Sequence, residues 1–147
     1  MEIETFWQDF KNRHPEIKTN HHDTYAMGGT DENATILAHL IARGIKTATT
    51  SAVDLYGPDE PLPFVGEYNV ILDGHDQPIC VTQTKVVETI PFNQVSAEHA
   101  YHEGEDDRTL ASWRREHRAF FQAAYQQEGQ SFTEEIPCCC EVFERID

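Results

Sequence analysis

Apolar residues recur at helical spacing in three stretches of the chain, which predicts three amphipathic helices. The first covers residues 3 to 13. The second begins at Thr30 or Asp31, whose side chains can cap a helix, and it ends at Gly44, a typical helix-stop residue. The third and longest covers residues 108 to 127. Its apolar face consists of Leu110, Trp113, His117, Phe120, Phe121 and Ala124.

Strand-like patterns lie between the second and third helices and at the end of the chain. Residues 45 to 53 are rich in threonine, which favours a strand. Two further strands are predicted near residues 67 to 72 and 79 to 88, and Asp73-Gly74-His75-Asp76 between them is a strong hairpin signal. Residues 138 to 146 form a closing strand. This order predicts an α+β fold, a small mixed and mostly antiparallel β-barrel with peripheral helices.

The remaining segments are polar or short. Residues 14 to 30 are rich in histidine, asparagine and glycine, so we expect an ordered loop there. Residues 96 to 102 indicate a short helical piece, which leads into the acidic loop of residues 103 to 107. Asp106 or Asp107 is expected to cap the long helix that follows, because acidic side chains stabilise helix N-termini.

Length and charge narrow the classes of function. A chain of 147 residues predicts a single domain over residues 1 to 147. Its 26 Asp and Glu against 11 Lys and Arg give a formal charge of −15 at pH 7. This acidity argues against long, non-specific nucleic-acid binding, which depends on neutralising phosphates. It still permits a small basic cleft or a substrate as small as one nucleoside.

The chain carries no apolar run that predicts a membrane span, and its N-terminus lacks the basic start of a signal peptide. Its four cysteines are Cys80 and the run of residues 138 to 140. Adjacent cysteines rarely pair with each other, and the run lacks the spacers of known zinc sites. We therefore expect reduced thiols, a cytoplasmic location and no membrane partner.

Lys46 and Thr49 are the first candidates for chemistry. A lysine that loses its charge in a partly buried pocket can take a proton from a threonine hydroxyl. Positions three apart on an ideal strand point to opposite faces, so the pair converges only where the strand bends or bulges. The competing interpretation is ordinary, since a lysine at the start of a strand is usually solvated.

The acidic loop and the histidines His99, His102 and His117 are the other candidates. Glu103 and Glu105 are not explained by helix capping, and such close like charges suit proton transfer. Carboxylates of this loop could also bind a divalent cation. His99 and His102 would share one helix face, which makes metal binding conceivable, although a packed or solvated role is the more ordinary interpretation.

Three motifs together resemble the ASCH domain family. The first is Gly44-x-Lys46-x-Ala48-Thr49-x-Ser51, and the second is Gly66 opening a strand. The third is Glu103-Gly104-Glu105-x-Asp107-x-x-Leu110-x-x-Trp113-Arg114-x-x-His117-x-x-Phe120-Phe121. The closing Cys140-Glu141-x-Phe143 also fits the last strand of this family. The resemblance extends from about Met27 to Ile146.

The resemblance implies a PUA-like β-barrel with a cleft between the barrel and its helices. Small bacterial members include amidohydrolases that remove the acetyl group from N(4)-acetylcytidine, with a lysine, a threonine three residues later and a glutamate as their functional set. Lys46 and Thr49 match the first two by spacing, and Glu103 matches the third, with Glu105 as the alternative. Those enzymes are shorter and carry an arginine at the position of Ser51. Glycine is common in the family at the position of Asp106.

The leading hypothesis is therefore a hydrolase acting on an N(4)-acylated cytidine or a related nucleoside amide, with Lys46, Thr49 and Glu103 as catalytic residues. Ser51, Glu105 and Tyr56 are the predicted substrate-binding residues, and Tyr25 and Phe64 are further candidates for stacking on a base. No cofactor and no metal are expected. The alternative is a PUA-like RNA-binding module, with or without metal-dependent ribonuclease activity, since the longer members resembled here are linked to RNA cleavage. A ligand-sensing module without chemistry is a third hypothesis.

Overall fold

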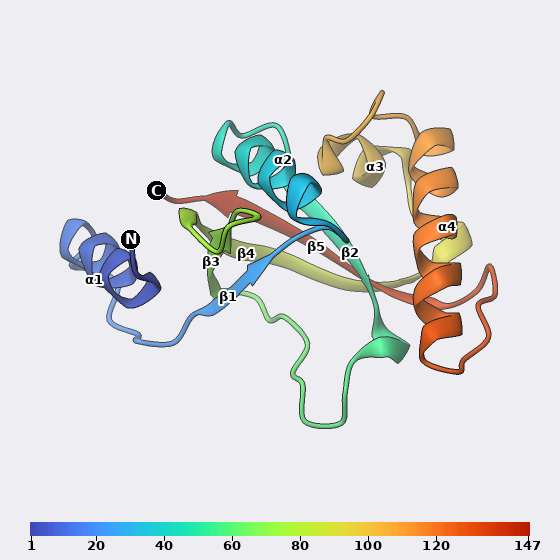
Figure 1. Ribbon diagram of the computed structural model, residues 1–147, viewed down its shortest axis with the longest axis horizontal. Coiled ribbons are helices and arrows are strands. Elements are labelled where there is room, and N and C mark those ends of the chain that lie inside the picture. Colours follow the sequence, from blue (N-terminus) through green and yellow to red (C-terminus); the bar gives the residue numbers. More distant parts are fainter.

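The computed structural model describes residues 1–147, in which four α-helices surround a five-stranded sheet (Figure 1). The helices are α1 (Ile3–Arg13), α2 (Asp31–Ala42), α3 (Ala97–Glu103) and α4 (Leu110–Gln127). The strands are β1 (Asp23–Ala26), β2 (Ala48–Ala52), β3 (Tyr68–Leu72), β4 (Pro78–Pro91) and β5 (Pro137–Arg145). Short 3-10 turns, Val53–Leu55 and Phe92–Gln94, follow β2 and β4. No helix is both long and apolar enough to cross a bilayer.

The sheet has the strand order β1-β3-β4-β5-β2, so β1 and β2 form its two edges. Every pair of neighbouring strands is antiparallel except β1 and β3, which are parallel. β4 is 14 residues long and pairs with β3 through its first part and with β5 through most of its length. Its register with β5 shifts between Thr84 and Val86, an irregularity that increases local bending and twist. The predicted α+β fold with a mostly antiparallel, barrel-like sheet is confirmed, and the sheet curls into a half-barrel.

One strand lies where the sequence predicted only a loop. Within residues 14 to 30, Asp23–Ala26 form β1 and pair in parallel with residues 69 to 72 of β3. The loop prediction was wrong for these four residues, which carry no clear alternation of apolar and polar side chains. Their pairing depends on a partner more than 40 residues away, a contact that local sequence patterns do not report.

The ends of the helices follow local chemistry, with small shifts from the prediction. Thr30 caps α2 by accepting a hydrogen bond from a backbone N–H, as expected. The C-cap is Arg43, and Gly44 follows it with a φ of +75°. The cap of α4 is Thr109, so the prediction that Asp106 or Asp107 caps this helix was wrong.

α2 and α4 pack into different core clusters of the sheet. Successive side chains of a strand point to opposite faces, and β5 shows this alternation clearly. Cys138 and Cys140 belong to one core cluster with Phe121 of α4. Phe143 belongs to another, with Ile41 of α2. β2 lies beside β5 at the sheet edge, so its hydroxyl side chains are divided between the two faces in the same way.

All four cysteines are buried free thiols. Burial raises the pKa of both Cys138 and Cys140 to about 12. Thiols with such a pKa remain protonated near neutral pH and are poor nucleophiles and metal ligands. Cys138 and Cys140 therefore serve as packing between the sheet and α4.

Gly74 provides a test of how tightly the β3–β4 turn packs on α2. Its N–H donates a 2.9 Å hydrogen bond to the Thr35 hydroxyl, and a Cβ on Gly74 would overlap the backbone carbonyl of Asp31. Gly74→Ala is expected to lower the free energy of unfolding by roughly 1–3 kcal/mol in urea denaturation. Gly57→Ala is the matched control, because a Cβ there would meet Glu60 only at 3.9 Å. Equal stability of the two variants would contradict the close packing.

Candidate functional site

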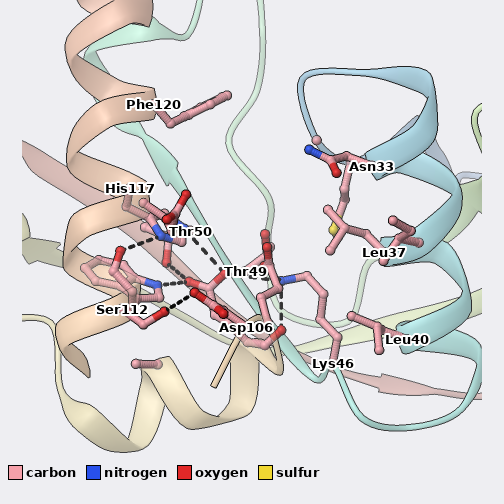
Figure 2. A pocket seen from close by; sticks show the side chains of 18 of the residues that line it. Asn33, Leu37, Leu40, Lys46, Thr49, Thr50, Asp106, Ser112, His117 and Phe120 are labelled. Atoms are coloured by element: carbon pink, nitrogen blue, oxygen red, sulfur yellow. Dashed lines mark hydrogen bonds and ion pairs between the residues drawn. The ribbon is translucent and has the colours of Figure 1, made fainter. Parts of the chain in front are cut away.

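A cavity of about 520 Å³, called here the Lys46 cavity, lies between α2 and α4 beside the edge strand β2 (Figure 2). The lining side chains of α2 include Asn33, Leu37 and Leu40, and those of α4 include Ser112, His117 and Phe120. The remaining polar groups include Lys46, Thr49, Thr50, Glu103, Glu105, Asp106 and Glu116. The cavity therefore combines an apolar wall on α2 with a dense group of titratable and hydroxyl side chains.

Lys46 is buried, with only 1% of its surface exposed. The chain turns sharply after α2, where the N–H groups of residues 45 and 46 both donate to the carbonyl of Leu40. This turn directs the Lys46 side chain inward. Its Nζ donates to the Ala48 carbonyl at 2.8 Å, to the Glu103 carbonyl at 3.3 Å and Oε1 at 3.2 Å, and to Glu105 Oε2 at 2.8 Å. The ordinary interpretation of a solvated lysine is wrong, because all these partners belong to the protein.

Glu103, the last residue of α3, is also 1% exposed. Its Oε2 accepts hydrogen bonds from the Thr50 hydroxyl at 2.6 Å and from Trp113 Nε1 at 2.5 Å. His99 Nε2 lies 3.3 Å from the same oxygen, and His117 Nε2 lies 3.6 Å from Oε1. One carboxylate thus joins α3, β2 and α4 to Lys46.

Gly104 allows Glu103 to lie this close to Lys46. It adopts a left-handed conformation with φ 72°, which glycine tolerates better than other residues. A Cβ at this position would approach the Ile45 carbonyl oxygen to 2.8 Å. Glycine is therefore required both by the turn after α3 and by the contact of that turn with the segment that carries Lys46. Asp106, where the family often has glycine, also has a left-handed φ of 54°.

The charged groups of this cluster stabilise one another's ionised forms. Burial would raise the pKa of the Glu103 carboxyl, but the charge of Lys46 and the contacts with His117 and His99 outweigh it and hold this pKa well below its usual range. Burial also opposes protonation of His117, but Glu103 raises the pKa of this histidine above its usual value. Glu103 is accordingly ionised at neutral pH.

Lys46 and Thr49 line the same cavity without a bend in the strand. Because β2 begins at Ala48, Lys46 precedes it, and the alternation of a strand does not govern its direction. The Thr49 hydroxyl makes no hydrogen bond within the chain, whereas that of Thr50 is hydrogen-bonded to Glu103. The three predicted catalytic residues, Lys46, Thr49 and Glu103, therefore line one cavity. Thr49 is the one whose side chain makes no hydrogen bond.

The predicted substrate-binding residues are divided between two cavities. Glu105 lines the Lys46 cavity and forms an ion pair with Lys46. Ser51 and Tyr56 instead line a second cavity of about 460 Å³, called here the Tyr56 cavity, and their hydroxyl oxygens lie 2.8 Å apart. Thr49 contributes to both cavities. Of the other stacking candidates, Tyr25 also lines the Tyr56 cavity, and Phe64 is half exposed outside both.

The partners of Glu103 could not be recognised as a group from the sequence. Thr50 lies in a stretch whose threonine content predicts only a strand. Trp113 and His117 belong to the predicted apolar face and to the family motif, and His99 and His117 are among the candidate histidines, but no predicted contact links them to Glu103. Their spacing carries a signal, because His99 and Glu103, like Trp113 and His117, are four residues apart on a helix and so face the same way. The stacking of Trp113 on His117, with ring centroids 4.3 Å apart, places both side chains beside the carboxylate.

His99 and His102 do not act as a pair. His99 Nε2 lies 2.8 Å from the Thr50 hydroxyl, inside the site. The His102 side chain is 46% exposed and lies near Thr47 and Glu98. No three His, Cys, Asp or Glu side chains are arranged to hold a metal ion.

The Lys46–Glu103 pair gives a stability prediction. Removing one partner of a buried ion pair leaves an unpaired buried charge, so Lys46→Met is expected to lower the free energy of unfolding by about 3–5 kcal/mol in urea. Adding Glu103→Gln should recover part of this loss. Lys85→Met is the control, because Lys85 and Glu144 form an exposed pair at 3.7 Å, for which a loss of at most about 1 kcal/mol is expected. Similar losses in the two single variants would show that the buried pair has no special role.

His117 gives a prediction about pH. A histidine whose pKa is raised on folding stabilises fully below its unfolded pKa, and this contribution is lost as pH rises through the folded pKa. The difference in free energy of unfolding between the wild type and His117→Gln should therefore be largest near about pH 6 and shrink toward about pH 8. His102→Gln controls for loss of an exposed histidine. A His117→Gln difference that is constant over this range would contradict the coupling to Glu103.

The chain is similar to members of a known protein family. Residues 23–147, from the start of β1 to the end of the chain, match the model of the ASCH domain. Protein EF3133 from Enterococcus faecalis V583, described by the family model DUF984, is 36% identical, with a TM-score of 0.88 over 99% of this chain and 92% of that chain. An ASCH domain from Lactobacillus crispatus JV V101 is 29% identical, with a TM-score of 0.85 over 99% of this chain and 95% of that chain.

No curated protein matches the chain. The family match nevertheless covers every strand of the sheet and every residue of the Lys46 cavity. The two solved structures share the fold over nearly the whole chain, including α1. This chain therefore belongs to the ASCH domain family.

Proposed function

We propose that the protein is an amidohydrolase that removes the acyl group from an N(4)-acylated cytidine or a related nucleoside amide. The observation that carries this proposal is the meeting of Lys46, Thr49 and Glu103 in one cavity. The spacing of these residues matches the functional set that the resemblance to the acetylcytidine amidohydrolases implies. A buried lysine between two carboxylates, in one cavity with a hydroxyl that has no partner, is also an arrangement suited to acyl transfer.

In the proposed reaction, Thr49 attacks the carbonyl carbon of the amide. Lys46 accepts the hydroxyl proton after passing one of its own to Glu105, whose Oε2 lies 2.8 Å from Nζ. The C–N bond then breaks, and the leaving amine takes a proton from Lys46. Water hydrolyses the resulting ester on Thr49, which releases the carboxylic acid and restores the hydroxyl.

Glu103 positions Lys46 in this scheme and does not donate a proton. Its pKa is held well below the usual range, so it carries no proton near neutral pH. Its Oε1 lies 3.2 Å from Nζ, and its Oε2 is occupied by Thr50 and Trp113. Its hydrogen bonds therefore support a role in orienting Lys46.

Cavity size and charge favour a small, uncharged substrate. A volume of about 520 Å³ falls within the usual range for sites that bind small molecules. The formal charge of −15 disfavours a polyanion. The alternative, an RNA-binding module with metal-dependent ribonuclease activity, calls for a basic groove, whereas both side chains that pair with Lys46 are acidic.

The test is hydrolysis of N(4)-acetylcytidine by the purified protein, followed as release of cytidine by chromatography. Thr49→Val removes the hydroxyl at nearly constant volume and should lower kcat/KM by about 100-fold or more. Thr47→Val is the matched control, because Thr47 lies two residues earlier, outside the cavity, and should retain wild-type activity. Circular dichroism melts verify that both variants are folded.

Two results would overturn the proposal. One is absence of turnover by the wild-type protein, and the other is equal turnover by Thr49→Val and Thr47→Val. Binding of a single-stranded RNA that weakens steeply between low and high salt, without cytidine release, would favour the RNA-binding alternative.

A further inference from the structure

The Tyr56 cavity has a different chemistry from the Lys46 cavity. Four carboxylate side chains line it, and no lysine or arginine does. They are Asp23, Glu60, Glu67 and Glu141. A concentration of one sign of charge in a concave site of about 460 Å³ focuses the electrostatic field on whatever enters it. We infer that this cavity is a binding site for an organic cation, a small ligand that carries a protonated amine, amidine or guanidine.

Glu141 shows that the cavity is more than an acidic surface. This residue of β5 is only 6% exposed. Its single side-chain hydrogen bond comes from the Thr84 hydroxyl to Oε1 at 2.6 Å, so Oε2 has no partner in the protein. Oε2 is not fully enclosed, so a ligand in the cavity can reach it, and a cation that donates a hydrogen bond there would stabilise a carboxylate that burial otherwise disfavours.

Glu67 is a second buried carboxylate of this cavity that a cation would stabilise. Its side chain is 7% exposed and contacts one cationic candidate, His21, whose Nε2 lies 3.0 Å from Oε2. The His21 side chain lines the cavity, is 58% exposed and contacts Glu67, whereas Glu141 has no cationic partner. Burial, together with the charges of Glu67 and Asp23, raises the pKa of Glu141 despite the hydrogen bond from Thr84. A bound cation would lower the pKa of Glu141 again, because it stabilises the ionised carboxylate.

The walls favour an organic cation over a metal ion. Tyr25 and Tyr56 line the cavity and offer aromatic surface for the body of a ligand, and ring faces attract ammonium and guanidinium groups. A metal ion instead requires several oxygen ligands converging on one point. No three acidic or histidine side chains are arranged in that way. The carboxylates are spread around a space large enough for a small molecule.

This site does not depend on the proposed hydrolysis. It shares Thr49 with the Lys46 cavity, but its carboxylates do not line that cavity. Failure of cytidine release would therefore leave the cation site untouched. Its test uses binding alone, with no readout of activity.

Isothermal titration calorimetry with putrescine tests the inference, because 1,4-butanediol has nearly the same shape without charge. Agmatine serves as the guanidinium probe. The titrations are done at about pH 8 and low salt, where histidine carries little charge and screening is weak. Wild-type protein should bind one of the two cations and show no binding of the diol. Glu141→Gln, which keeps the acceptor for Thr84, should weaken the cation affinity roughly tenfold or more.

Glu144→Gln is the matched control, because Glu144 lies on the same strand, is exposed and does not line the cavity. It should bind the cation as the wild type does. A second measurement uses wild-type protein only: the cation should shift the backbone amide resonances of Ser51 and Tyr25 and leave that of Phe121 unchanged. The inference is overturned if neither cation binds, if Glu141→Gln binds as tightly as Glu144→Gln, if the diol binds equally well, or if Ca²⁺ displaces the cation and binds there more tightly.

Discussion

The buried ion pair between Lys46 and Glu103 is the interaction on which the site depends. Two opposite charges in an apolar interior are tolerated only when they meet each other and find further hydrogen bonds. Lys46 follows the turn after α2, and Glu103 ends α3, so their pairing fixes two segments that are far apart in the sequence. Gly104 makes this approach sterically possible. The position of the Lys46 cavity follows from this single requirement.

The same carboxylate also fixes α4 to the sheet. Thr50 of β2 and Trp113 of α4 donate hydrogen bonds to the same oxygen of Glu103, so this carboxylate links the two elements. The polar cluster thus lies at the centre of the packing and has little freedom to move. Thr49 differs from its neighbours because its hydroxyl takes no part in the network. A rigid surrounding with one free hydroxyl is the arrangement that a nucleophile or a water-positioning group requires.

The helices and four of the five strands could be predicted from the sequence, because their apolar spacing or threonine-rich composition is a local signal. Asp23–Ala26 could not, since this strand exists only through pairing with β3. The burial of Lys46 could not be predicted either, because a lysine at the start of a strand is usually solvated and the partners of this one include residues 103 and 105, far away in the sequence. The family resemblance supplied Lys46, Thr49 and Glu103 as a set, but not their contacts. Partners of Glu103 such as Thr50 could not be predicted, because their contacts depend on how α3 and α4 pack on the sheet.

The two cavities meet at Thr49, yet their charged groups are separate. Lys46 and Glu103 belong to one, and Glu67 and Glu141 belong to the other. Substitutions in the Tyr56 cavity can consequently change ligand preference without disturbing the ion pair that supports the fold. A protein built in this way can acquire new specificity at little risk to its stability, and the β5 face around Glu141 is the natural place to begin such redesign.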